Sequence, residues 1–126
     1  MDTNVLIRHL TGDPPEMAAR ATGALAGAEE LLLADLVLAE CVYVLESFYE
    51  VPRERVAELM RAAIALPAIK ALDAPSLLHA LEVYEVYRLD FAEAYLVAQA
   101  EATGVDAVLS FDKTIDRVDT ITRREP

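Results

Sequence analysis

Short apolar runs alternate along this chain with longer segments of helical periodicity, and this alternation limits the folds that the chain can adopt. The short runs occupy 31–34, 68–72, 105–111 and 119–123. Strands that alternate with helices are typical of a parallel sheet covered by helices on both faces. We therefore expect an α/β fold with three layers, α/β/α, around a mostly parallel central sheet of about four or five strands.

Prolines and a glycine mark the ends of the expected helices. Pro14 and Pro15, Pro52 and Pro75 suit the first turn of a helix, and Gly104 suits the position just after one. These signals predict helices over 14–27, 35–49, 52–66, 75–88 and 90–104.

Apolar residues at spacings of three and four predict which faces of two helices are buried. In 35–49 the predicted stripe is Val37, Cys41, Val44, Leu45 and Phe48. In 90–104 it is Phe91, Ala94, Tyr95 and Ala98.

Composition narrows the class of protein. With 126 residues, 55% of them hydrophobic, the chain can bury a core of its own, and we expect one domain over 1–126. A formal net charge of −11 argues against broad attraction to nucleic acid or to an anionic membrane. The apolar runs are too short to span a membrane and no secretory signal is present, so we expect a cytoplasmic location.

The single cysteine and two histidines cannot form a zinc cluster, so any metal here would have oxygen ligands. Ligands of open parallel sheets bind beyond the carboxyl ends of the strands. Asp112 follows the strand predicted over 105–111, in the sequence SFDK, although an aspartate there also suits a capped turn.

Three further segments carry acids near predicted helix starts. Asp90 and Glu93 lie three residues apart, which suits both a shared face and a capping box. Glu40 interrupts the apolar run LVLAECVYVLE, where a half-exposed flank position is the alternative. Asp2 stands two residues before Asn4, in a triplet that also suits a simple helix start. Hard oxygen ligands in this number suit Mg²⁺ or Mn²⁺.

The ordered series DTN, LAECVYVLE, DFAEAYLVAQA and VLSFDK resembles the PIN domain, specifically the VapC-type toxin ribonucleases of toxin and antitoxin pairs. The resemblance covers nearly the whole chain. It implies a PIN-like α/β/α domain whose acids bind one or two Mg²⁺ or Mn²⁺ ions and cleave RNA, with tRNA among the substrates to test, leaving a 5′-phosphate and a 3′-hydroxyl. It also implies a homodimer and a VapB-like antitoxin that binds apolar helical surface, for which 75–88 and the helix around CVYVLESFY are the candidates.

The resemblance also implies a role for each matching residue. The catalytic acids would be Asp2, Glu40, Asp90 and Asp112, with Glu93 as a further metal ligand. Asn4 and Ser110 would support the site. Lys113, directly after Asp112, is the best candidate for a phosphate contact, with an ordinary surface lysine as the alternative.

This chain departs from the family pattern at two places. The family usually has aspartate where this chain has Glu93, so Asp90 is the safer ligand on that helix. Family members also place an apolar strand before the DTN aspartate, whereas only Met1 precedes Asp2 here. We expect that a few upstream strand residues are missing because the assigned start is late.

Two other functions fit parts of the pattern. A phosphotransferase of the haloacid-dehalogenase kind also uses an aspartate at a strand end, but it needs a second aspartate where Asn4 stands. An α/β interaction module with an inactive acidic cluster is the other alternative, favoured by Glu93 and by the missing lead strand.

Overall fold

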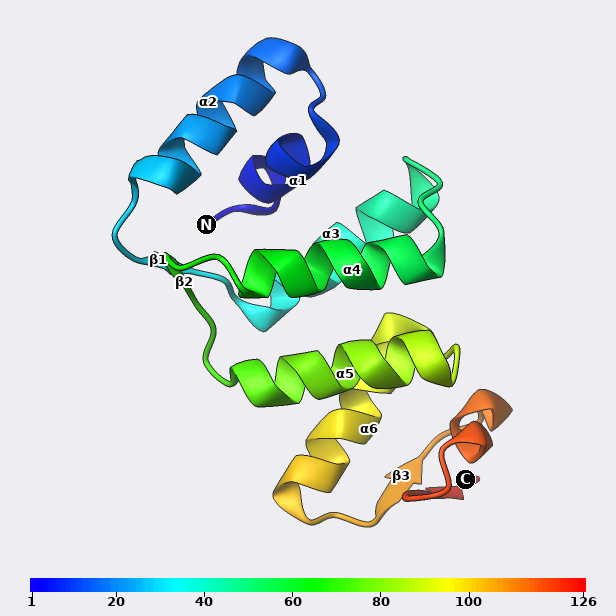
Figure 1. The fold of residues 1–126 in the computed structure, drawn as a ribbon. Helices are drawn as coiled ribbons and strands as arrows, with labels where there is room; N and C mark the ends of the chain where they lie inside the picture. The colour runs from blue at the N-terminus through cyan, green and yellow to red at the C-terminus, as the bar shows by residue number, and fades with distance from the viewer. The chain divides into compact units, whose positions relative to one another are not determined.

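The computed structural model describes all residues from Met1 to Pro126. The chain divides into two compact units, a first unit over Met1–Ala74 and a second unit over Pro75–Pro126 (Figure 1). The expectation of one domain over 1–126 stays a prediction, and each unit is described here by itself.

The first unit holds four helices and a pair of short strands. In chain order its elements are α1 (Thr3–Thr11), α2 (Pro15–Gly27), β1 (Leu31–Leu32), α3 (Asp35–Ser47), α4 (Arg53–Ile64) and β2 (Ile69–Lys70). Strands β1 and β2 are parallel, with Leu31 opposite Ile69. The amino group of Met1 donates a hydrogen bond of 2.9 Å to the carbonyl of Leu32.

The second unit holds two helices, a 3₁₀ helix and a second pair of strands. Its elements are α5 (Ala74–Val86, whose first residue ends the first unit), α6 (Phe91–Thr103), β3 (Ala107–Leu109), η1 (Lys113–Arg117) and β4 (Thr122–Arg124). Strands β3 and β4 are parallel, with Val108 opposite Arg123. Helix α6 ends at Thr103, and the left-handed φ of 76° at Gly104 lets the N–H of Val105 donate to the carbonyl of Ala100 at 2.9 Å.

The sheet is smaller than the sequence predicted. The α/β class and the parallel strands are confirmed, and all five predicted helices are present. The expected central sheet of four or five strands is not seen, because each unit contains one two-stranded sheet. Asp2 leads directly into α1, and the expectation of further strand residues upstream stays a prediction. None of the helices has the length and apolar character to span a bilayer.

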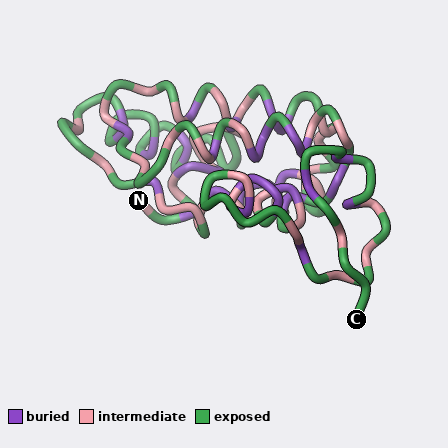
Figure 2. The backbone as a smooth tube through the Cα atoms, turned by 90° about the horizontal axis from the view of Figure 1, so that it is seen from below, coloured by how far each residue is buried: buried purple, intermediate pink, exposed green.

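Helix packing corrects part of the predicted core. On α3 the buried side chains are Leu38, Cys41, Val42 and Leu45, so Cys41 and Leu45 are confirmed. Phe48, predicted to be buried, is 75% exposed. On α6, Phe91, Ala94 and Ala98 are buried as predicted, whereas Tyr95 is half-buried. Figure 2 shows the resulting alternation of buried and exposed positions along the helices.

Candidate metal centre

The first unit brings Asp2 and Glu40 into the same neighbourhood through the start of α1. Asp2 is the N-cap of α1, but its side chain makes no capping hydrogen bond, so the carboxylate is left for other contacts. The next residue, Thr3, is buried and donates a hydrogen bond of 2.8 Å from Oγ1 to Oε2 of Glu40 on α3. This bond joins two segments 37 residues apart in the sequence.

The negative charges of Asp2 and Glu40 affect the pKa of the nearby Cys41 thiol. Burial, followed by the charges of Glu40 and Asp2, raises the pKa of the Cys41 thiol to about 12. A thiol with so high a pKa is protonated at neutral pH and cannot act as a nucleophile.

Asn4 is exposed on the first turn of α1, and its side chain makes no hydrogen bond to protein. It lines a groove together with Asp2 and Arg8. A neutral amide beside a carboxylate can hold a water or a substrate oxygen. The predicted supporting role of Asn4 remains a prediction.

In the second unit, Asp90 starts α6. It is the N-cap of that helix without a capping hydrogen bond from its side chain, so the capping alternative is not realised at Asp90. The turn before it contains Arg88 at a φ of 58°, a left-handed conformation uncommon outside glycine. Arg117 holds this turn by donating to the carbonyls of Tyr87 at 3.3 Å and Arg88 at 3.0 Å.

Glu93 lies in the first turn of α6, three residues after Asp90. Its Oε2 atom is buried and has no hydrogen-bond partner. Burial raises the pKa of the Glu93 carboxyl, and the charges of Asp90 and Asp112 raise it further. Asp90 and Asp112 therefore each lie within electrostatic range of Glu93.

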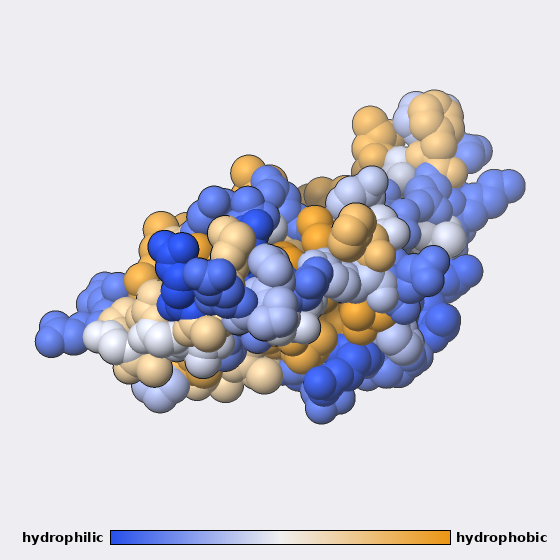
Figure 3. All heavy atoms as spheres, turned by 90° about the horizontal axis from the view of Figure 1, so that it is seen from above, coloured by the Kyte–Doolittle hydropathy of each residue, from blue (hydrophilic) through white to orange (hydrophobic).

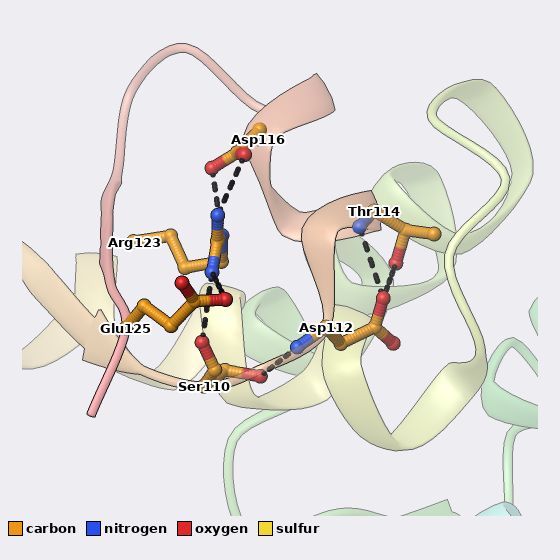
Figure 4. A network of polar contacts seen from close by, with 6 residues as sticks. All are labelled: Ser110, Asp112, Thr114, Asp116, Arg123 and Glu125. Carbon is orange, nitrogen blue, oxygen red and sulfur yellow. Dashed lines mark hydrogen bonds and ion pairs between the residues drawn. The ribbon is translucent and has the colours of Figure 1, made fainter.

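Asp112 lies in the turn between β3 and η1 (Figure 4). Its Oδ1 accepts hydrogen bonds from the Thr114 backbone N–H at 2.9 Å and from the Thr114 hydroxyl at 2.7 Å. These two bonds, with the nearby charges of Arg117 and Arg123, lower the pKa of the Asp112 carboxyl. The capping alternative is thus confirmed, and Oδ2 stays free for a second role.

Ser110 and Arg123 fix the same turn. The backbone N–H of Asp112 donates to Oγ of Ser110 at 2.9 Å. Arg123 on β4 donates to the Ser110 carbonyl at 3.0 Å and pairs through two nitrogens with Asp116 at 3.0 and 3.1 Å (Figure 4). A two-point guanidinium contact is more directional than a single bond. Arg123 therefore braces the backbone that carries Asp112.

Sequence reasoning missed the groups that hold these acids in place. Thr114, Arg117 and Arg123 each position an acid or its turn, and only their contacts in the fold reveal it. Lys113, which the sequence suggests as a phosphate contact, is exposed and makes no ion pair. Its position next to Asp112 leaves that role a prediction.

The donor set fits a hard divalent cation. Within neither unit do three or more His, Cys, Asp or Glu side chains converge closely enough to enclose an ion. The buried, unpartnered Oε2 of Glu93 beside two further carboxylates is nevertheless the environment that a cation would neutralise. The candidate ligands are Asp90, Glu93 and Asp112 in the second unit and, separately, Asp2 and Glu40 in the first unit.

Comparison with known proteins gives one clear result. The model of the PIN domain family matches residues 1–121. The match includes every acid described above, from Asp2 to Asp112. No curated protein sequence matches the chain. Because the family match covers nearly all of the 126 residues, the chain belongs to the PIN-domain family.

Proposed function

We propose that this protein is a metal-dependent endoribonuclease, the VapC-like toxin of a type II toxin and antitoxin pair. Membership of the PIN-domain family supports nuclease chemistry, because PIN domains are generally metal-dependent nucleases. The single observation that carries the proposal is Glu93, whose buried Oε2 has no hydrogen-bond partner and whose neighbours are two more acids. Such a group is stabilised by a cation.

The proposed catalytic acids are Asp2, Glu40, Asp90 and Asp112, with Glu93 as a further ligand. When bound, Mg²⁺ or Mn²⁺ supplies Lewis acidity and a water of lowered pKa for phosphodiester hydrolysis. The free Oδ2 of Asp112 and the uncapped Asp90 offer oxygens for an ion, while Thr114 and Arg117 keep their backbones in place. The proposed products are a 5′-phosphate and a 3′-hydroxyl.

Two neighbours of the acids are proposed to assist. Ser110 would keep the Asp112 turn in register through its hydrogen bond to the Asp112 N–H. Lys113 would contact a substrate phosphate, since its ammonium group is exposed and unpaired beside that turn.

The proposed partners are an RNA substrate, a VapB-like antitoxin and a second copy of the chain. Exposed apolar side chains on and after α3 support a binding surface there: Tyr43 is 69% exposed and Phe48 is 75% exposed. Val86 at the end of α5 is also exposed. Figure 3 shows apolar atoms reaching the surface among hydrophilic ones on the face that it draws.

The direct test is RNA cleavage. The protein would be incubated with total RNA, including tRNA, with Mg²⁺ or Mn²⁺ and with a chelator. We expect fragments with 5′-phosphates only when metal is present, and no fragments from Asp2→Asn. Glu58→Gln is the matched control, because Glu58 forms an exposed ion pair with Arg55 and should be dispensable. Cleavage that persists in chelator would refute the metal dependence.

An inactive interaction module is the second candidate. It is favoured by the absence, within either unit, of three acids already arranged as ligands. A calorimetric titration with Mn²⁺ separates the two functions. Binding that is lost in Asp90→Asn supports the nuclease, whereas no heat at millimolar Mn²⁺ supports the interaction module.

A further inference from the structure

A groove of about 690 Å³ runs between α1 and α2 in the first unit. From the α1 side it is lined by Asp2, Asn4 and Arg8, and from α2 by Met17 and Arg20. Spacings of three and four residues place side chains on one face of a helix, so the groove is formed by two facing stripes. It begins at Asp2, a proposed metal ligand, and continues along α1 to Arg8, six residues or about 9 Å further along the helix axis.

The two arginines in this groove lack protein partners. Neither Arg8 nor Arg20 makes a side-chain hydrogen bond or ion pair, and Nε of Arg8 is buried without an acceptor. Arg55, in contrast, pairs with Glu58, and Arg123 pairs with Asp116. Arg20 is exposed at the rim of the groove, whereas Arg8 is half-buried and its Nε has neither an acceptor nor solvent. A buried guanidinium nitrogen without an acceptor is stabilised when an anion enters.

We propose that this groove binds a backbone phosphate of the RNA strand adjacent to the phosphate that is cleaved, with Arg8 and Arg20 as its donors. The inference rests on the proposed function, since it uses Asp2 as part of the reaction centre. A strand cleaved beside Asp2 must continue past it, and the groove starts there. Guanidinium groups match phosphate oxygens in geometry as well as in charge. Met17 adds an apolar wall on which a sugar or base can pack.

Binding without cleavage tests the proposal. Fluorescence anisotropy would follow a labelled single-stranded RNA of about ten nucleotides with the full-length protein in chelator, at several salt concentrations. Arg8→Gln and Arg20→Gln should each weaken binding roughly tenfold and reduce the salt dependence by about 0.7 in log–log slope, one phosphate contact each. Arg8→Lys, which retains the charge, should recover part of the affinity. Arg55→Gln is the matched control and should bind as the wild type does.

The binding experiment has four informative outcomes for the proposed phosphate site. Loss of affinity and of salt slope in both groove variants, with unchanged thermal melting, supports the proposal. Wild-type affinity in both groove variants overturns it, even if the wild type cleaves RNA with metal. Arginine-dependent binding of RNA with no cleavage under any metal refutes the proposed function and leaves the phosphate site standing. Arginine-dependent binding of an acidic peptide of ten glutamates, without RNA binding, assigns the groove to a protein partner and overturns the proposal.

Discussion

The two units carry carboxylates of the same type in contrasting environments. In the first unit, Oε2 of Glu40 accepts a hydrogen bond from the buried hydroxyl of Thr3. In the second unit, Oε2 of Glu93 is buried with no donor, and Asp90 and Asp112 add negative charge around it. A side-chain donor therefore holds Oε2 of Glu40, whereas Oε2 of Glu93 has no donor and a backbone hydrogen bond only partly offsets the cost of burying its carboxyl group.

This difference predicts that the two acids respond differently to a bound cation. A carboxylate with a fixed donor is held in one orientation whether or not a cation is present. A buried carboxylate without a donor favours whatever neutralises it, either a proton or a metal ion. We therefore expect metal affinity to depend most strongly on the second unit, and the geometry of Glu40 to depend on the first.

The largest expected effect comes from removing one acid in each unit. Asp90→Asn and Glu40→Gln should each lower the cleavage rate by at least about 100-fold, because each removes the charge of a proposed metal ligand. Asp90→Asn should cause the greater loss, since Asp90 lies within range of the uncompensated Glu93. Initial rates over a range of Mn²⁺ concentrations would measure this. A greater loss of cleavage rate in Glu40→Gln than in Asp90→Asn would contradict the expectation that metal affinity depends mainly on the second unit.

Glu93→Gln should weaken Mn²⁺ binding roughly tenfold yet stabilise the metal-free protein. The raised pKa of Glu93 means that the folded state holds its proton more tightly than the unfolded state does. That contribution to stability is present below the unfolded pKa of about 4.5 and is lost as the pH rises through the raised value. At pH 7 in chelator the melting temperature of Glu93→Gln should exceed that of the wild type by a few degrees.

The pH dependence of the melting temperature tests whether the stabilisation in Glu93→Gln comes from removing the carboxylate charge. The gain from Glu93→Gln should shrink as the pH falls below about 4.5, where the native carboxyl is protonated in both states. Glu82→Gln, an exposed acid on α5 of the same unit, is the matched control and should show no such gain. Equal melting temperatures of Glu93→Gln and wild type at pH 7 would contradict the uncompensated burial of Glu93.

A smaller effect is expected for Thr3→Val, which removes the donor to Glu40 while conserving side-chain volume. The loss of one hydrogen bond should cost about 1 kcal/mol of folding stability and slow cleavage several-fold, because Glu40 is no longer held in one orientation. Thr103→Val is the control, since its hydroxyl bonds only within α6. Urea unfolding and cleavage rates measure the two effects. An unchanged cleavage rate would show that Glu40 needs no fixed orientation.

The smallest effect concerns Cys41. With a pKa of about 12, roughly one thiol in ten thousand is ionised at pH 8, so iodoacetamide should hardly react with the folded protein. Full reaction is expected in urea. Because the charge of Glu40 contributes to the raised pKa of Cys41, Glu40→Gln should speed the reaction of the folded protein slightly. Rapid alkylation of the folded wild type would contradict the burial of Cys41.

The sequence predicted the helices well and the sheet poorly, for physical reasons. Proline at the start of α2 and glycine after α6 act locally, so their effect can be read without knowing the fold. A strand of two residues, such as β1, leaves almost no periodicity to detect. The number of strands in one sheet depends on pairing between distant segments, which local patterns do not encode.

The buried face of α3 is likewise not determined by the local sequence pattern. Apolar residues surround this helix on nearly every side, from Leu36 to Leu45, so spacing alone does not choose a face. Candidate acids are easier to single out in the sequence, because charges at the edges of apolar runs are conspicuous. Which acids are compensated depends on partners such as Thr3 and Thr114, and these contacts exist only in the folded chain.

The brace formed by Arg123 has a practical consequence for choosing a fragment boundary. The family match ends at Ile121, two residues before Arg123, so a fragment trimmed to the matched residues would contain every proposed ligand. It would nevertheless lack β4, the only strand that pairs with β3, and the guanidinium that holds the Ser110 carbonyl. Trimming at the family boundary would thus leave the acids in place but release the turn that carries Asp112.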